Sequence, residues 1–131
     1  MIFNQYRTHS DHRRSGSYDI FPILPGDMNF TIHAPKVKPE ELHRHLIQTD
    51  YFTVVKGSVL FWLQYEDGKN EKFILTDQDK KTLSIPPGVW HGYMALKKDT
   101  IMVFYITQKF NPNDEFRKKC DPKEWKLPRK A

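Results

Sequence analysis

The sequence contains a single cysteine, Cys120, and no apolar run long enough to cross a membrane. A lone cysteine cannot form an internal disulfide, which excludes a disulfide-stapled secreted domain and fits a reducing cytoplasm. A spanning helix needs about 18 or more consecutive apolar residues, so a membrane-spanning helix is excluded. The first residues are polar and lack the apolar segment of a secretory signal. We therefore expect a cytoplasmic protein with no membrane partner.

What the chain does contain is enough aromatic side chain for one folded domain. It has 131 residues, of which 14% are aromatic, whereas disordered chains are poor in aromatics. A chain of this length forms one domain. The formal net charge is +5, and the excess lies in residues 109–131. Nucleic-acid-binding proteins carry their basic patches on the folded body, so we expect no nucleic-acid partner. The basic tail could instead attract an anionic ligand.

Period-two alternation of apolar residues dominates the central sequence and predicts short β-strands. Turn signals occur at Asp67-Gly68 and Pro87-Gly88. Helical periodicity is absent before about residue 113, and residues 113–119 favour a short terminal helix. Many short strands with frequent turns predict an all-β sandwich or barrel. The clearest strand segments are 21–25, 28–33, 51–55, 59–65, 72–75, 82–85 and 100–107.

We divide the chain into an N-terminal arm at residues 1–18, a β-barrel at 19–110 and a C-terminal tail at 111–131 that packs on the barrel. A small barrel of this kind exposes sheet edges and apolar strand faces, which pairing with a second copy would cover. We therefore predict a homodimer, in which the polar arm could cross to the partner.

Three histidines and one carboxylate have spacings that suggest a metal centre. His43 and His45 alternate on a probable strand, so both imidazoles face one side. Asp50 follows five residues later, and His91 comes directly after a proline turn. These four side chains make a ligand set for a divalent transition metal, Zn, Fe, Ni or Mn. Taken one at a time, each is more often a structural residue, and only the joint spacing favours ligation.

The joint spacing resembles the two motifs of the cupin family. His43-x-His45, Asp50 and Gly57 fit the second half of the first cupin motif, with Asp in place of the family's Glu. Pro86-Pro87-Gly88-Val89-Trp90-His91 fits the middle of the second motif. The opening glycine of each motif and the closing Asn of the second are missing. The resemblance implies a single cupin domain, a double-stranded β-helix or jelly-roll barrel, with a metal inside it.

A second resemblance points to cupins that act on nucleotide-activated 4-keto sugars, the dTDP-4-dehydrorhamnose 3,5-epimerase and sugar 3,4-ketoisomerase families. It implies an isomerase that binds a sugar nucleotide or another anionic sugar. The segments that carry it are Glu40-Glu41-Leu42-His43-Arg44-His45, Val54-Val55-Lys56-Gly57, Pro86-Pro87-Gly88-Val89-Trp90-His91-Gly92-Tyr93, Phe110-Asn111-Pro112-Asn113-Asp114-Glu115, and Asp121-Pro122 with Trp125.

The epimerase catalytic residues are matched only in part. The resemblance carries the family's catalytic His onto His43, whereas the family's substrate-binding Arg falls on Glu40. The family's Lys, Tyr and Asp are not matched. A neutral His43 qualifies as the base that removes a proton beside a ketone, but it could not serve as a free base while it ligates a metal.

Other residues then become candidates for proton transfer and substrate binding. Tyr105 or Tyr93 would carry protons, and Trp62, Trp90 and Tyr93 could contact a sugar or a base. Core packing is the ordinary alternative for Tyr105 and for both tryptophans. Two further functions stay open, namely a metal-dependent cupin dioxygenase and a non-catalytic sugar-binding cupin.

Overall fold

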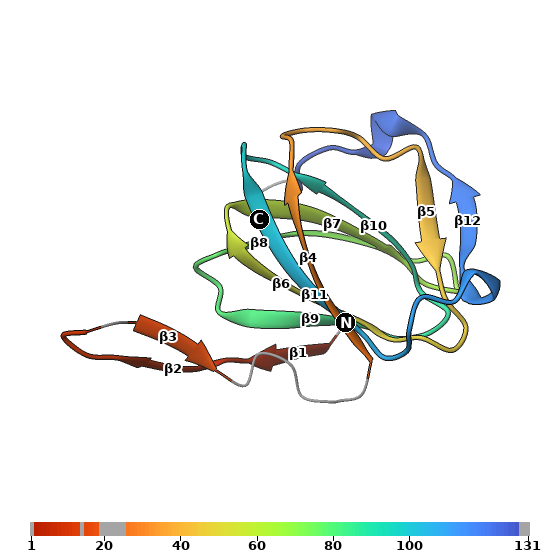
Figure 1. Cartoon of the computed structure of the whole chain (residues 1–131). Helices are drawn as coiled ribbons and strands as arrows, with labels where there is room; N and C mark the ends of the chain where they lie inside the picture. The colour runs from red at the N-terminus through yellow and green to blue at the C-terminus, as the bar shows by residue number, and fades with distance from the viewer. Residues whose placement is uncertain (1, 14, 19–25, 129–131) are drawn as a thin grey trace.

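The computed structural model describes residues 2–13, 15–18 and 26–128. It is almost entirely β-structure arranged in two facing antiparallel sheets (Figure 1). The all-β jelly-roll prediction is confirmed. The predicted strand at 21–25 lies outside the described residues. The strands are β1 (Ile2–Gln5), β2 (Arg7–Ser10), β3 (Ser15–Tyr18), β4 (Asp27–His33), β5 (Glu41–Arg44), β6 (Asp50–Lys56), β7 (Ser58–Gln64), β8 (Asn70–Thr76), β9 (Lys81–Ile85), β10 (Trp90–Ala95), β11 (Thr100–Ile106) and β12 (Phe116–Lys119), with 3-10 turns η1 (Pro112–Asp114) and η2 (Pro122–Glu124).

The first sheet has the strand order β1-β9-β6-β11-β4, and the second has the order β12-β5-β10-β7-β8. Neighbours far apart in the sequence are typical of a jelly roll, because the chain crosses repeatedly between the two sheets. The crossings bring β5, β6 and β10 together. Three of the four predicted metal ligands lie on these strands, and the fourth, His45, directly follows β5.

Strand β7 shows how the sequence alternation becomes two packed faces. Val59, Phe61 and Leu63 point between the sheets into the main core. Leu60 and Trp62 point to the other face, where they are also buried. Both faces are apolar because the C-terminal segment covers the outer one, where Trp125 packs edge-on against Trp62 with ring centroids 5.4 Å apart.

Strands from the predicted arm and from the predicted tail join the two sheets. In the arm, β1 pairs with β9, while β2 and β3 form a separate hairpin that projects from the body (Figure 1). In the tail, β12 pairs with β5. The predicted helix at 113–119 is wrong: one 3-10 turn forms at η1, capped by the Asn111 side chain, and the chain then extends. The open edge of β5 offers backbone partners that override the weak local helical preference. None of the helical segments among the described residues is long and apolar enough to span a membrane.

Candidate active site

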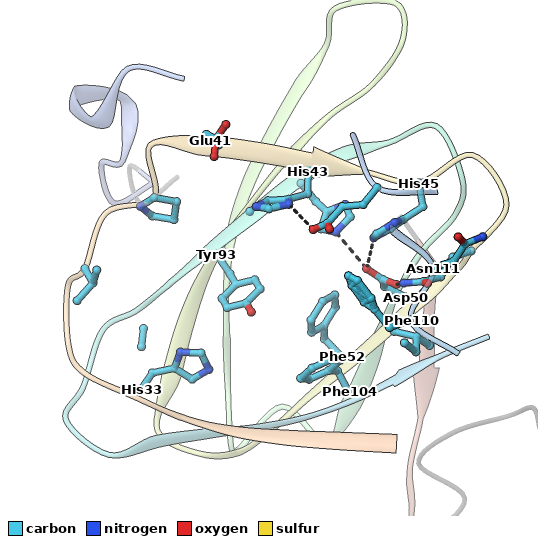
Figure 2. A pocket seen from close by; sticks show the side chains of 18 of the residues that line it. His33, Glu41, His43, His45, Asp50, Phe52, Tyr93, Phe104, Phe110 and Asn111 are labelled. Carbon is cyan, nitrogen blue, oxygen red and sulfur yellow. Dashed lines mark hydrogen bonds and ion pairs between the residues drawn. The ribbon is translucent and has the colours of Figure 1, made fainter. Parts of the chain in front are cut away.

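A cavity of about 540 Å³ opens between the two sheets. Its walls carry the imidazoles of four histidines, from β4, β5, the loop after β5, and β10, and the carboxylates of three acids (Figure 2). The remaining lining is mostly apolar and aromatic. A concave apolar pocket with a few convergent polar groups is the usual form of a small-molecule site. The polar lining includes His33, His43, His45, His91, Glu41, Asp50 and Glu115.

Three of the four predicted metal ligands converge in this cavity. The Nε2 atom of His45 lies 3.3 Å from Oδ2 of Asp50, and the Nε2 atom of His91 lies 3.2 Å from the same oxygen. One nitrogen or oxygen atom from each of the three residues lies within 4.8 Å of the others. Asp50 and His91 are buried, and His45 is half-buried. The spacing argument therefore identified three residues that do meet in space.

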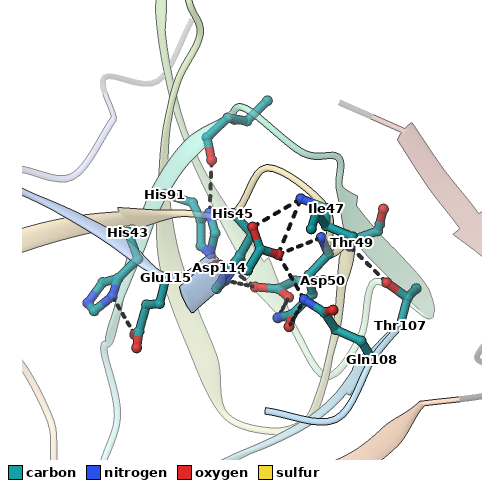
Figure 3. A network of polar contacts seen from close by, with 12 residues as sticks. His43, His45, Ile47, Thr49, Asp50, His91, Thr107, Gln108, Asp114 and Glu115 are labelled. Atoms are coloured by element: carbon teal, nitrogen blue, oxygen red, sulfur yellow. Dashed lines mark hydrogen bonds and ion pairs between the residues drawn. The ribbon is translucent and has the colours of Figure 1, made fainter. Parts of the chain in front are cut away.

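The ring orientations of His45 and His91 are fixed by hydrogen bonds at their Nδ1 atoms, on the side of each ring away from Asp50. The Nδ1 atom of His45 lies 2.7 Å from the backbone oxygen of Asp114, and that of His91 lies 3.0 Å from the backbone oxygen of Val89 (Figure 3). Because a carbonyl can only accept, each Nδ1 must carry the proton and donate it. Both Nε2 atoms are thus directed at Asp50, in the arrangement that orients metal-ligating histidines.

The charges in this group are stabilised by mutual contact. Burial by itself would raise the pKa of Asp50, but hydrogen bonds from His45, His91 and Gln48 hold it well below the ordinary range. Burial would likewise lower the pKa of His45, yet its hydrogen bonds with Asp50 and the Asp114 carbonyl outweigh burial and raise that pKa. In the absence of a cation, Asp50 therefore stays ionised, and its contact with His45 favours the protonated form of that imidazole.

The fourth predicted ligand, His43, lies outside the group of three. Its Nδ1 atom lies 3.2 Å from Oε1 of Glu115, which comes from the tail. Burial, followed by the positive charge of Arg117, lowers the pKa of His43 despite the opposing effect of Glu115. The imidazole is therefore neutral near pH 7 and has a carboxylate behind it. His43, which the sequence predicts either as a ligand or as a base, thus lies beside a carboxylate and apart from the other three predicted ligands.

Tyr93 lies in the cavity as predicted, whereas Tyr105 does not. Figure 2 shows the hydroxyl of Tyr93 pointing into the cavity, below His43. Burial, and then the negative charge of Asp50, raise the pKa of Tyr93, so its hydroxyl keeps its proton. On β11, Phe104 and Ile106 line the cavity. Tyr105 lies between them and must point to the opposite face, where it packs on Tyr51.

Neither predicted tryptophan lines the cavity. Trp62 is buried on the outer face of the second sheet, and the guanidinium of Arg44 lies 4.6 Å from the ring centre of half-buried Trp90. The aromatic side chains that do line the cavity are those of Phe52, Phe104, Phe110 and Tyr93. Strand alternation places neighbouring side chains on opposite faces of a strand, but it could not indicate which face was the inner one.

Sequence reasoning missed Asp114, a buried acid in the tail. Its carboxylate accepts hydrogen bonds from the backbone N–H groups of residues 46–48 and from the side chain of Gln108 (Figure 3). Its backbone oxygen also accepts from His45. One tail residue thus shapes the loop between β5 and β6, which carries His45. The only sequence signal was an acid within a tail segment resembling the epimerases.

The family model for dTDP-4-dehydrorhamnose 3,5-epimerase matches residues 42–128, which include every side chain of the group of three and the dyad of His43 and Glu115. The chain belongs to this family.

The relatives agree with this assignment. The dTDP-4-dehydrorhamnose 3,5-epimerase of Mycobacterium tuberculosis is 28% identical over 74 residues, covering 52% of this chain and 37% of that protein. The probable low-salt glycan biosynthesis epimerase Agl13 of Haloferax volcanii is 26% identical over 106 residues, covering 74% and 67%. The sequence match thus covers well under half the length of the mycobacterial relative.

Among solved structures, a mutant of the 3,4-ketoisomerase QdtA from Thermoanaerobacterium thermosaccharolyticum, in complex with TDP-4-keto-6-deoxyglucose, superimposes with a TM-score of 0.75. The identity is 14%, and the match covers 88% of this chain and 85% of that one. At this identity, the likeness shows that the epimerase-family chain shares its fold with a ketoisomerase.

Proposed function

We propose that the protein is an epimerase or isomerase of a nucleotide-activated 4-keto sugar. The observation that carries this proposal is the dyad of His43 and Glu115 on the cavity wall. A carbon next to a ketone loses its proton to a base of near-neutral pKa, and returning a proton to the other face or to the neighbouring carbon gives an epimer or an isomer. A neutral imidazole with a carboxylate behind it fits the first step.

The geometry supports a role for each group. Because Nδ1 of His43 is bonded to Glu115, Nε2 is the atom that accepts the proton. Glu115 then stabilises the imidazolium that forms. Tyr93 keeps its proton and points into the same cavity, so its hydroxyl serves as the donor. The aromatic walls exclude water around the reacting carbons.

The substrate class rests on the family and on the complexes of its neighbours. Solved 3,4-ketoisomerase structures hold TDP or TDP-4-keto-6-deoxyglucose. A 4-keto-6-deoxy sugar presents the acidic C–H groups that this dyad requires. A nucleotide-linked sugar is therefore the ligand we propose.

The test uses TDP-4-keto-6-deoxyglucose in D₂O, with deuterium uptake at the carbons beside the ketone followed by NMR. Wild-type protein should exchange these protons, and His43→Asn should lower the rate at least about 100-fold. His9→Asn, an exposed histidine of the β2–β3 hairpin, is the control. Binding without exchange by wild-type protein would favour a non-catalytic sugar-binding cupin.

We also propose that His45, Asp50 and His91 hold a divalent cation. The supporting observation is that two Nε2 atoms and one carboxylate oxygen, all oriented from behind, lie within 4.8 Å of one another. Two histidines and one carboxylate suit Zn, Fe, Ni or Mn and leave further coordination positions open. When bound there, such an ion would act as a Lewis acid toward a ketone oxygen. His43 would stay free as the base.

Metal content after incubation with each of the four ions, gel filtration and elemental analysis tests this site. His45→Ala should abolish stoichiometric uptake, and His43→Ala should retain it because His43 faces Glu115. Uptake lost equally in both variants would restore the four-ligand set predicted from the sequence. Activity that requires O₂ and iron would instead favour a cupin dioxygenase.

We propose a homodimer as well. On β4, Met28, Phe30 and Ile32 point outward and are 61%, 70% and 63% exposed, at an edge of the first sheet. An apolar edge strand is normally covered, and a second copy with its projecting hairpin would cover it. Light scattering should give the dimer mass for wild-type protein and for the control Leu127→Glu, and the monomer mass for Phe30→Glu. A monomeric wild type would refute the dimer.

A further inference from the structure

The cavity is rich in acidic groups. Its described lining includes Glu41, Asp50 and Glu115 and contains no lysine or arginine. A diphosphate group placed deep in such a cavity would face these carboxylates, with no lysine or arginine side chain beside it. A cationic side chain at the rim would stabilise the phosphates of a sugar nucleotide at that end of the cavity.

Strand β12 places a cation at that rim. In the pairing of β12 with β5, Arg117 lies opposite His43 and Lys119 lies opposite Glu41. Glu41 and His43 line the cavity, so Arg117 and Lys119 are on the cavity-side face of β12. Lys118 is on the other face, where its ammonium lies over the Trp90 ring.

The guanidinium of Arg117 is tied to the site by two long ion pairs. Nη1 lies 3.6 Å from Glu41, and Nη2 lies 3.4 Å from Oε1 of Glu115. Oε1 is the same oxygen that His43 contacts at 3.2 Å. The side chain is 55% exposed, so an incoming anion can reach it. Lys72, by contrast, pairs with Glu124, which does not line the cavity.

We infer that Arg117 is the residue that binds the diphosphate of the substrate; this inference rests on the proposed function. An arginine presents a planar fork of donors that matches two phosphate oxygens. One sugar ring separates the phosphate ester from the carbons beside the ketone. Arg117 contacts the same Glu115 oxygen as the base, His43. It therefore lies close enough to the base to bind the phosphate end of the substrate. Phosphate binding would also draw Arg117 away from Glu115 and leave that oxygen to His43.

Calorimetric titrations with TDP, thymidine and inorganic pyrophosphate test the inference. Arg117→Ala should weaken TDP and pyrophosphate about tenfold or more, as expected for lost charge-assisted hydrogen bonds, and leave thymidine unchanged. Arg117→Lys should recover only part of the loss because it lacks the fork. The control Lys118→Ala removes a charge from the same strand but from the opposite face, and should stay within about twofold of wild type.

The outcomes separate this inference from the proposed function. Equal TDP affinity in wild type and Arg117→Ala would overturn the role of Arg117 while leaving a sugar-nucleotide enzyme intact. Pyrophosphate binding that depends on Arg117, without any added affinity for TDP, would keep the anion subsite and refute the nucleotide substrate. Equal losses of affinity in Arg117→Ala and Lys118→Ala would show that only the net charge of the strand matters. That result would also overturn the inference. Circular dichroism of each variant verifies folding.

Discussion

At the scale of single residues, the site is built on carboxylates that each serve several partners. Asp50 Oδ2 contacts two imidazoles, and Oε1 of Glu115 contacts His43 and Arg117. Asp114 accepts from three successive backbone N–H groups. Because such acceptors keep their charge when it is matched by donors, the burial of these acids is tolerated and the rings around them are held in place.

The role of Glu115 predicts a kinetic effect without a binding effect. Glu115→Gln keeps the shape of the side chain but removes the charge that stabilises protonated His43. We expect kcat for the deuterium exchange to fall about 100-fold, with KM changed by less than about threefold. Steady-state kinetics measure both, and Glu124→Gln, an exposed acid paired with Lys72, is the control. A normal kcat in Glu115→Gln would remove the dyad from the mechanism.

At the scale of elements, the C-terminal segment completes both the site and the core. Strand β12 extends the second sheet, and η2 leads to Trp125, which is 3% exposed. The Trp125 indole donates a hydrogen bond to the Pro39 oxygen at 2.9 Å. Gly92 on β10 allows this approach, since a Cβ there would lie 3.2 Å from the indole ring. The tail is therefore anchored through packing rather than through pairing alone.

This anchoring predicts a large stability effect from one tail residue. Trp125→Ala should lower the free energy of unfolding by about 3–5 kcal/mol because it leaves a cavity against Trp62 and Gly92. Leu127→Ala, two residues further on and 61% exposed, should change it by less than about 0.5 kcal/mol. Urea denaturation followed by tryptophan fluorescence measures both. Similar values for the two variants would show that the tail contributes little to the core.

At the scale of the whole molecule, two sheets enclose a charged cavity, and the hairpin of β2 and β3 extends away from them (Figure 1). Charged groups in this cavity and in the loop beside it link folding to pH. Asp50 and Asp114 have folded pKa values below the ordinary 3.8, and His45 has one above 6.5.

The cytoplasmic location expected from the sequence stays a prediction.

Stability of the metal-free protein should therefore fall on both sides of a mildly acidic optimum. A carboxyl with a lowered folded pKa contributes stability above its unfolded pKa and loses it as pH falls through the folded value. His45, with a raised pKa, contributes below about 6.5 and loses its contribution as pH rises through the folded value. Melting temperatures after chelation should drop below about pH 4 and decline gradually above about pH 6.5. Asp114→Asn should reduce the drop in melting temperature at acidic pH. An unchanged drop in this variant would contradict the role given to Asp114.

The sequence by itself determined the fold class and three of the four side chains that were expected to meet in a cluster. Period-two alternation is a local property of the backbone, so it was sufficient to predict the strands. The spacing of His45, Asp50 and His91 was sufficient to predict that these three side chains meet. This is because the jelly roll fixes where a His-x-His strand and a proline turn lie relative to each other. The family resemblance was confirmed by a match over residues 42–128.

Only the tertiary structure decided which face of each strand is the inner one and what the tail does. Alternation gives two faces of equal standing, so Trp62 and Tyr105 could be assigned to a face but not to the cavity. His43 turns to Glu115, 72 positions along the chain, because β12 pairs with β5 instead of forming the expected helix. Such long-range pairing depends on which backbone edge is left open after the sheets assemble, and no local pattern in the sequence specifies that edge.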